Sequence, residues 1–422
     1  MKLTDFSDDE LKTKQSELLG AYSQFKEAAL SLDLTRGKPC TEQLDLSNDL
    51  DGILEGFFLL QNGADVRNYG GILGIPEARQ MGADILTLHP AQVMVGGNSS
   101  LTLMYNMIAH MIPRWNAEAK ETNSKVKFIC PVPGYDRHFT ICESFDIEMI
   151  NVDLLSSGPD MDVIENLLDK DPMIKGIWCV PKYSNPTGHT YDKETVIRFS
   201  QLGKIASQNF RIMWDNAYVA HHLTDSPAQL HDLMGESMQA GTEDNLVMLA
   251  STSKITFAGA GISFLGTSEK NLAAFEKYLT PQMIGFDKVN QLRHVRFLQG
   301  GSNLATHMSK HKNLLDPKFI MVQKKLQEAL GDKGIAEWTK PEGGYFVSLD
   351  TLPGIASKVV ELASGAGVKL TPAGATYPYG IDPENRNIRL APTFPSLSDL
   401  EKALDVLVVC LELASTDYLL SH

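Results

Sequence analysis

The chain has few cysteines and no long apolar segment. Its five cysteines are scattered, without a Cys-x-x-Cys pair, at Cys40, Cys130, Cys142, Cys179 and Cys410. This pattern is typical of reduced, buried thiols and disfavours disulfides or a metal site, so we expect a cytoplasmic protein. No apolar run approaches the roughly 20 residues that a membrane-spanning helix needs. The acidic first ten residues lack the apolar core of a signal peptide.

Positive charge is also scarce. The 38 lysines and arginines are outnumbered by 52 aspartates and glutamates, which gives a formal net charge of −14. Nucleic acids and anionic membranes are bound by basic surfaces, so we expect neither as a partner. The chain does have length and apolar content. Its 422 residues, 43% of them hydrophobic, are enough for two domains with separate cores.

Short apolar runs alternate with helical patterns between about residues 48 and 280. This alternation predicts a mainly parallel sheet with functional groups at the strand ends. The predicted strands are 93–95, 126–130, 147–150, 176–180, 211–214 and 246–250. Residues 8–32 and 281–330 are expected to be helical. The remainder of the chain, which includes 343–347 and 387–390, predicts a small α+β domain.

One lysine stands at the end of a predicted buried strand. Lys254 follows the apolar run 246–250 and lies among the hydroxyl residues of the segment 251–256. The glycine-rich run 258–261 comes directly afterwards. A lysine by itself is usually a solvated surface residue. At this position its amine would be desolvated and its pKa lowered, as an amine needs to be to form a Schiff base with a carbonyl compound.

Two upstream segments carry polar residues in the same way. Asn185, in the segment Tyr183-Ser184-Asn185-Pro186-Thr187-Gly188, follows the strand at 176–180, and Asp215 and Tyr218 follow the strand at 211–214. In this order the three segments resemble the fold-type I pyridoxal-phosphate (PLP) enzymes, specifically the class I aminotransferases. The resemblance extends from about residue 34 to 389.

The resemblance implies an α/β fold in which a three-layer α/β/α large domain contains a mainly parallel sheet with one antiparallel strand. A smaller α+β domain accompanies it. We expect the large PLP-binding domain at 48–295 and the small domain at 1–47 and 296–422. The family also implies a homodimer with shared active sites. Tyr69 matches a tyrosine that reaches the phosphate of the neighbouring subunit, although it could equally be an ordinary loop residue.

The resemblance also implies the catalytic roles. Lys254 would hold the cofactor and move a proton between the substrate Cα and C4′, first as base and then as acid. Asp215 would pair with the protonated pyridine nitrogen, because a buried carboxylate without a partner costs several kcal/mol. Tyr218 and Asn185 would hydrogen-bond the phenolate oxygen O3′.

Further residues match the cofactor's surroundings. Tyr135 would stack on the pyridine ring and His138 would support Asp215, although each by itself would be interpreted as structural. The glycine-rich segment 96–100 opens a helix, where backbone N–H groups and hydroxyls bind anions. The alternative is a plain turn with a helix cap. The resemblance assigns phosphate binding to Asn98, Ser99, Ser100, Ser251 and Ser253.

One departure concerns the phosphate. Many class I aminotransferases have an arginine eight residues after the lysine, where this chain has Ile262. With the opening segment 34–39, this resembles the divergent bacterial subgroup of aspartate aminotransferases related to MocR-type aminotransferase domains. A PLP lyase or decarboxylase on the same fold is the enzymatic alternative. A MocR-type regulatory module is disfavoured, because the acid-rich residues before Arg36 fit no helix-turn-helix.

The substrates implied are L-aspartate, or another amino acid, and 2-oxoglutarate. Arg389 matches the bidentate clamp for the α-carboxylate, whereas its neighbour Arg386 is expected to be solvated. Gly37 matches a glycine whose backbone closes over the substrate, and Asn185 would contribute as well. The second carboxylate of a dicarboxylic substrate needs another cation, for which the candidates are Arg36, Lys288 and Arg293.

Overall fold

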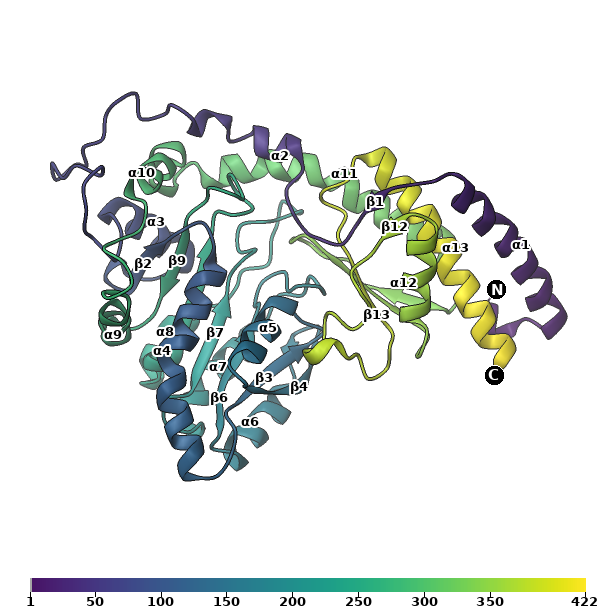
Figure 1. Cartoon of the computed structure of the whole chain (residues 1–422), viewed down its shortest axis with the longest axis horizontal. Coiled ribbons are helices and arrows are strands. Elements are labelled where there is room, and N and C mark those ends of the chain that lie inside the picture. The colour runs from purple at the N-terminus through teal and green to yellow at the C-terminus, as the bar shows by residue number, and fades with distance from the viewer. Residues whose placement is uncertain (1) are drawn as a thin grey trace.

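An eight-stranded sheet forms the centre of the larger part of this computed structural model, which describes residues 2–422 (Figure 1). The strand order is β2-β9-β8-β7-β6-β3-β4-β5. The strands are β2 (Val93–Gly96), β3 (Lys127–Val132), β4 (Glu148–Leu155), β5 (Gly158–Pro159), β6 (Ile174–Cys179), β7 (Arg211–Asp215), β8 (Leu246–Ser251) and β9 (Ser263–Gly266). All six predicted strands are therefore present.

The sheet is mainly parallel. Strands β4, β3, β6, β7 and β8 are parallel neighbours, whereas β9 is antiparallel to both β2 and β8. The two-residue β5 adds a third antiparallel pair, with β4. Neither β9 nor β5 was predicted as a strand, because β5 has only two residues and β9 has only two apolar residues between Ser263 and Gly266.

Helices cover both faces of this sheet. In β8, Val247 and Leu249 pack into the core on one face, while Leu246 and Met248 pack on the other. Such double burial explains why the strand sequence is continuously apolar. One face is covered by α4 (Ser100–Glu121), α5 (Asp136–Ser144) and α9 (Glu269–Leu279). The opposite face is covered by α3 (Pro76–Leu86), α6 (Met161–Lys170), α7 (Lys193–Ile205), α8 (Leu233–Ala240) and α10 (Lys288–Phe297). The expected three-layer α/β/α arrangement is confirmed.

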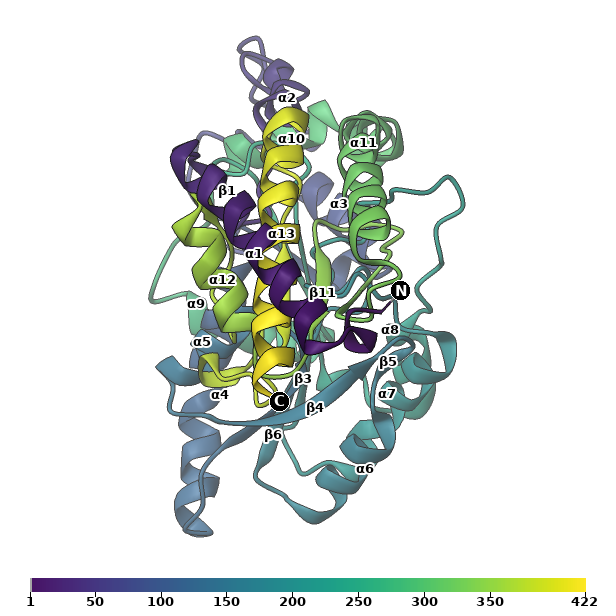
Figure 2. The ribbon, with the colours of Figure 1, turned by 90° about the vertical axis from the view of Figure 1, so that its right-hand side faces the viewer.

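The smaller part of the molecule combines two small sheets with long helices. Its strands are β1 (Leu32–Asp33), parallel to β12 (Val368–Lys369), and the antiparallel set β10 (Ala336–Trp338), β11 (Val347–Thr351) and β13 (Asn387–Leu390). Its helices are α1 (Asp8–Glu27), α2 (Thr41–Asp45), α11 (Leu304–Leu330), α12 (Ala356–Gly365) and α13 (Leu397–Ser421). Helix α1 lies along α13, which brings both ends of the chain to the same side (Figure 2).

Two helix predictions differ from the structure in their bounds. The helix expected over 8–32 ends at Glu27, because Ala29 adopts a left-handed φ of 47° that a helix cannot continue through. The helical segment expected over 281–330 is divided into α10 and α11 by the turn Gln299–Gly301, where Gly300 has φ 67°. The predicted domain boundary at 295 falls inside α10, and the division into domains stays a prediction. No helix within residues 2–422 combines the length and apolar character needed to cross a membrane.

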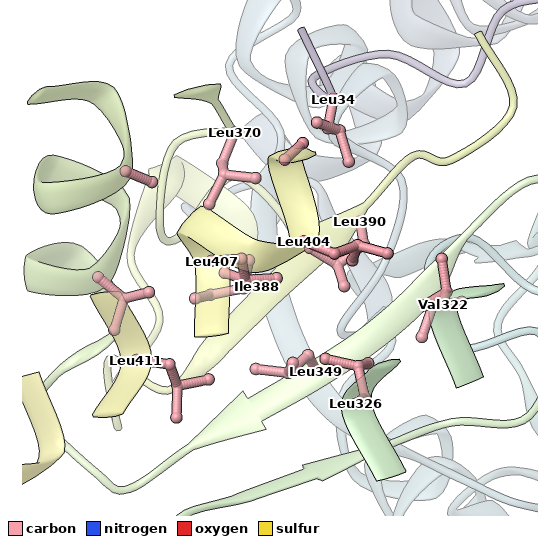
Figure 3. Close-up of a cluster of buried hydrophobic side chains, with 14 of the residues drawn as sticks. Leu34, Val322, Leu326, Leu349, Leu370, Ile388, Leu390, Leu404, Leu407 and Leu411 are labelled. Atoms are coloured by element: carbon pink, nitrogen blue, oxygen red, sulfur yellow. The ribbon is translucent and has the colours of Figure 1, made fainter. Parts of the chain in front are cut away.

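A leucine-rich core holds β13 in place. Ile388 and Leu390 of β13 pack with Leu349 of β11 and with leucines of α13 and α11 (Figure 3). Successive side chains in a strand point to opposite faces. Arg389, between these two core residues, therefore points away from the helices, towards the large sheet.

Candidate active site

Functional side chains gather where the parallel strands end. Tyr135, Asn185 and Lys254 lie in the segments that follow β3, β6 and β8, and Asp215 is the last residue of β7. Carboxyl ends of parallel strands meet at one edge of the sheet, which is where open α/β sheets place their ligands. Residues far apart in the sequence are thereby brought to the same edge.

Lys254 lies in a tight turn directly after β8. The N–H groups of Ile255 and Thr256 both donate to the Thr252 carbonyl at 2.9 Å, and the Thr252 hydroxyl accepts from the N–H of Ile262 at 2.9 Å. Burial lowers the pKa of the Lys254 amine, and the charge of Asp215 opposes this shift. This direction agrees with the expectation from the sequence, and the catalytic role of Lys254 stays a prediction. Its Nζ lies 5.0 Å from the centroid of the Tyr218 ring.

Asp215, the last residue of β7, is only 2% exposed. Its Oδ2 lies 3.1 Å from Nε2 of His138, whose ring stacks on Trp178 with centroids 4.3 Å apart. Its Oδ1 is buried and has no hydrogen-bond partner within residues 2–422. A buried carboxylate oxygen without a donor is costly. The site therefore fits a ligand that brings an N–H here, as a protonated pyridine ring does.

Two tyrosines lie beside this carboxylate. The ring of Tyr135 meets His138 edge-on with centroids 5.0 Å apart. Burial, together with the charges of Asp215 and Asp136, raises the pKa of Tyr135 to about 12. Burial likewise raises the pKa of Tyr218. Both phenols are therefore protonated at neutral pH and can donate hydrogen bonds.

The glycine-rich segment between β2 and α4 lies against the turn that carries Lys254. The Asn98 amide donates to the Gly259 carbonyl at 3.2 Å, and the Ser253 hydroxyl donates to the Asn98 carbonyl at 2.9 Å. Ser99 is the residue before α4, and its side chain makes no capping hydrogen bond. The first N–H groups of α4, beginning at Ser100, thus lack a side-chain cap from Ser99.

This arrangement is suited to an anion. Ser251 is the last residue of β8, directly before the turn, and its hydroxyl accepts from the N–H of Ser253 at 3.4 Å. Helix N-termini and hydroxyl groups bind phosphate through neutral donors and the helix dipole. Ile262, at the position where the resemblance implies an arginine, is 1% exposed and belongs to the apolar core. Neutral donors would thus have to replace the charge of that arginine.

Arg389 reaches the same edge from β13. Its Nη1 donates to Asp136 Oδ1 at 2.9 Å and to Asn185 Oδ1 at 3.3 Å, and its Cζ lies 5.0 Å from the centroid of the Phe346 ring. Gly37 lies against this ring so closely that an added Cβ would be 2.5 Å from Phe346 Cζ. Gly37, Asn185 and Arg389 are thus brought together, as the resemblance implies.

Four residues of this site were not predicted from the sequence: His221, Tyr345, Phe346 and Asp136. The His221 ring and the Tyr345 hydroxyl each contact the Lys254 carbonyl at 3.3 Å. Burial is the main cause that lowers the pKa of His221 to about 3, so its imidazole is neutral. Asp136 directly follows Tyr135, and this adjacency was the only sequence signal for it. The other three are marked by no local pattern.

Other predicted residues are not brought to Lys254. Tyr69 is 84% exposed, and the Lys288 amine donates to its carbonyl at 3.1 Å. Arg36 is exposed and Arg293 is partly buried. Arg386 pairs with Glu384 at 3.1 Å, but its side chain is only 32% exposed and its Nε is buried, so it is less solvated than expected.

Comparisons with known proteins show the family to which this chain belongs. A family model described as aspartate amino-transferase matches residues 6–422. The aspartate aminotransferase of Corynebacterium glutamicum is 43% identical over 99% of this chain and 97% of its own. An aminotransferase-family protein of Mycolicibacterium smegmatis is 48% identical over 94% of each chain. The crystal structure of an aspartate transaminase from Corynebacterium glutamicum superimposes with a TM-score of 0.95, at 42% identity and 99% coverage of both chains.

The fold and the strand-end residues define a fold-type I aminotransferase, a class of enzymes that uses PLP. Within this class, the chain belongs to the aspartate aminotransferase family. It is an aminotransferase, and the predicted fold and enzyme class are confirmed. The relation to MocR-type domains stays a prediction.

Proposed function

We propose that this aminotransferase binds PLP at the end of β8 and moves an amino group between L-aspartate and 2-oxoglutarate. The observation that carries the cofactor assignment is the buried Asp215 Oδ1, which has no partner within residues 2–422, on the same sheet edge as the desolvated Lys254 amine. The choice of aspartate is supported by the name of the Corynebacterium glutamicum relative, which is 43% identical to this chain.

When bound, PLP supplies an electron sink for the negative charge that develops at the substrate Cα. Asp215 would keep a proton on the ring nitrogen, and His138 would hold Asp215 through Oδ2. Lys254 would hold the cofactor and then move the proton from Cα to C4′. The lowered pKa of Lys254 supports this role, because only a neutral amine can accept a proton.

The remaining cofactor contacts follow from the same edge. Tyr135 would cover a ring face, and Tyr218 and Asn185 would donate to O3′. The phosphate would be bound by neutral groups of the segment between β2 and α4 and of the turn after β8, namely Asn98, Ser99, Ser100, Ser251 and Ser253. The α4 N-terminus supports this assignment, because Ser99 does not cap it.

Arg389 would bind the substrate α-carboxylate, with Asn185 beside it and the Gly37 backbone over it. A dicarboxylic substrate also needs a cation for its second carboxylate, because burying an unpaired charge is costly. Arg36 adjoins Gly37, while Lys288 and Arg293 lie on α10. We assign the second carboxylate to this group of three cations.

We further propose a cytoplasmic homodimer with shared active sites. The exposure of Tyr69 supports the dimer, since a tyrosine 84% exposed is available to a second copy. Lys288 donates to the Tyr69 carbonyl and would move with it. The five buried, free cysteines support a reducing compartment.

The cofactor assignment is tested by chemical labelling. The purified protein is expected to be yellow, and borohydride should fix the cofactor covalently to Lys254. Peptide mapping identifies the labelled lysine, and the other lysines of the chain serve as internal controls. A label on a different lysine would show that the central assignment is wrong.

The substrate assignment is tested by comparing aspartate with alanine as amino donor. Neutralising Arg36, Lys288 or Arg293 one at a time should, for at least one of them, raise KM much more for aspartate than for alanine. If no variant changes the aspartate-to-alanine ratio of kcat/KM, these candidates fail. If the unmodified enzyme prefers a neutral or aromatic donor, the aspartate assignment fails while the aminotransferase activity stands.

A further inference from the structure

Asp136 is the only carboxylate that the structure pairs with Arg389 within residues 2–422. It is the first residue of α5, which covers one face of the large sheet, whereas Arg389 belongs to β13 of the smaller part. Their side chains meet at 2.9 Å although 253 residues separate them in the sequence. The Arg389 side chain is 6% exposed and that of Asp136 is 35% exposed. The pair therefore joins the two parts of the molecule at the edge of the site.

The hydrogen bonds of Arg389 determine which edge of its guanidinium is free. A guanidinium has five N–H donors in a fixed planar arrangement, two of them on Nη1. Both recorded hydrogen bonds of Arg389 start from Nη1, one to Asp136 and one to Asn185. Its Nε is buried and has no partner within residues 2–422. The edge formed by Nε and Nη2 is thus left for a bidentate contact with a carboxylate.

We propose that Asp136 is a positioning residue for the substrate carboxylate: by holding Nη1, it turns the Nε–Nη2 edge of Arg389 towards the substrate. This rests on the proposed role of Arg389. Asn185 cannot hold Nη1 equally well, because its contact is longer, at 3.3 Å, and its oxygen is uncharged. The Phe346 ring restrains the guanidinium from a different direction, but does not distinguish its two edges.

A second role for Asp136 would have the opposite effect. Its negative charge lies close to the incoming carboxylate and could simply repel it. Removing the charge would then lower KM. Positioning predicts the reverse, because a guanidinium that is free to rotate presents its bidentate edge for only part of the time.

The test compares Asp136→Ala, Asp136→Ser and Asp136→Asn in the PLP-loaded enzyme. Alanine and serine cannot reach Nη1, so KM for both the amino acid and the 2-oxo acid should rise about tenfold, the loss of one charge-assisted hydrogen bond. We expect kcat to change less than about threefold, since Lys254 and Asp215 are untouched. Asparagine keeps the Oδ1 acceptor, so its KM should stay within about threefold of the unmodified enzyme.

Glu384→Gln is the matched control, because Glu384 pairs with the neighbouring Arg386 at 3.1 Å on the surface. It should leave KM unchanged. Calorimetry with succinate, a dicarboxylate that cannot react, should give dissociation constants in the same order as KM. Thermal unfolding establishes that each variant is folded, and the serine variant replaces the alanine variant if that one is not.

The inference is overturned if the alanine and serine variants keep or lower KM, or if kcat falls while KM and succinate binding are unchanged. Arg389→Lys separates this result from a failure of the proposed function. Lysine keeps the charge and loses the fork. If Arg389→Lys leaves KM unchanged, Arg389 is not the clamp. If it raises KM while the Asp136 variants do not, only the role of Asp136 is wrong.

Discussion

Gly37→Ala should disturb substrate binding through a steric clash. An alanine Cβ at this position would lie 2.5 Å from Cζ and 2.8 Å from Cε1 of the Phe346 ring. Carbon atoms in contact are normally about 3.5–4.0 Å apart, so the ring or the Gly37 backbone must move by about 1 Å. Phe346 is 5% exposed and meets the Tyr218 ring edge-on with centroids 6.2 Å apart, so the ring has little room to move.

The clash should affect both stability and KM. Overpacking of this kind typically costs about 1–3 kcal/mol. The Phe346 ring also lies 5.0 Å from the Arg389 guanidinium. A shifted ring would therefore misplace the group proposed to bind the substrate carboxylate. We expect KM for aspartate and 2-oxoglutarate to rise about tenfold, which corresponds to about 1.4 kcal/mol of the cost.

Steady-state kinetics and urea unfolding measure these two effects. Gly20→Ala is the control, because Gly20 lies inside α1 and an added Cβ there has no atom within 4 Å. Alanine is the better helix former, so the control should stabilise the protein by up to about 1 kcal/mol without changing KM. A Gly37→Ala enzyme with unchanged KM and undiminished stability would refute the idea that Phe346 is held in place.

Three further predictions concern the buried groups of the site. Asp215→Ala should lose most activity yet retain some cofactor, because the phosphate-binding groups remain; near-normal kcat would contradict the proposed role of Asp215. His138→Phe leaves Asp215 Oδ2 without its histidine partner, so the free energy of unfolding should fall by about 1–3 kcal/mol. The cofactor should also be lost faster on dialysis. Unchanged cofactor retention would contradict the proposed support of Asp215 by His138. Burial lowers the pKa of His221 from 6.5 to about 3 and that of His311 from 6.5 to about 4. Between each lowered pKa and pH 6.5, the unfolded chain therefore binds more protons than the folded chain. The free energy of unfolding should therefore keep its full value above about pH 6.5 and fall towards pH 4 by up to about 1.4 kcal/mol per pH unit for each histidine. Urea unfolding at several pH values measures this slope, and His311→Gln should make it shallower. An equal slope would show that His311 does not contribute.

The amino-acid sequence determined the sheet and the order of its functional groups. The runs 93–95, 212–214 and 246–250 are continuously apolar because helices bury both faces of β2, β7 and β8. A run of this kind is visible in the sequence without knowledge of its neighbours. Parallel strands end at one edge, so Asp215 and Lys254 could be expected to lie together.

Short or irregular elements could not be predicted in the same way. Strand β9 has four residues after a glycine-rich run, and it is recognised only by its pairing with β2 and β8. The end of α1 at Glu27 depends on the left-handed conformation of Ala29, which is not a residue that usually marks a helix end.

Only the tertiary structure decided the contacts between the two parts of the molecule. The sequence indicated Arg389 as a clamp, but its pairing with Asp136 depends on how β13 docks against the end of β3, 253 residues away. The packing of Gly37 against Phe346 and the contact of His221 with the Lys254 carbonyl are decided in the same way. Periodicity and capping describe neighbours within one element, whereas these contacts depend on the path of the whole chain.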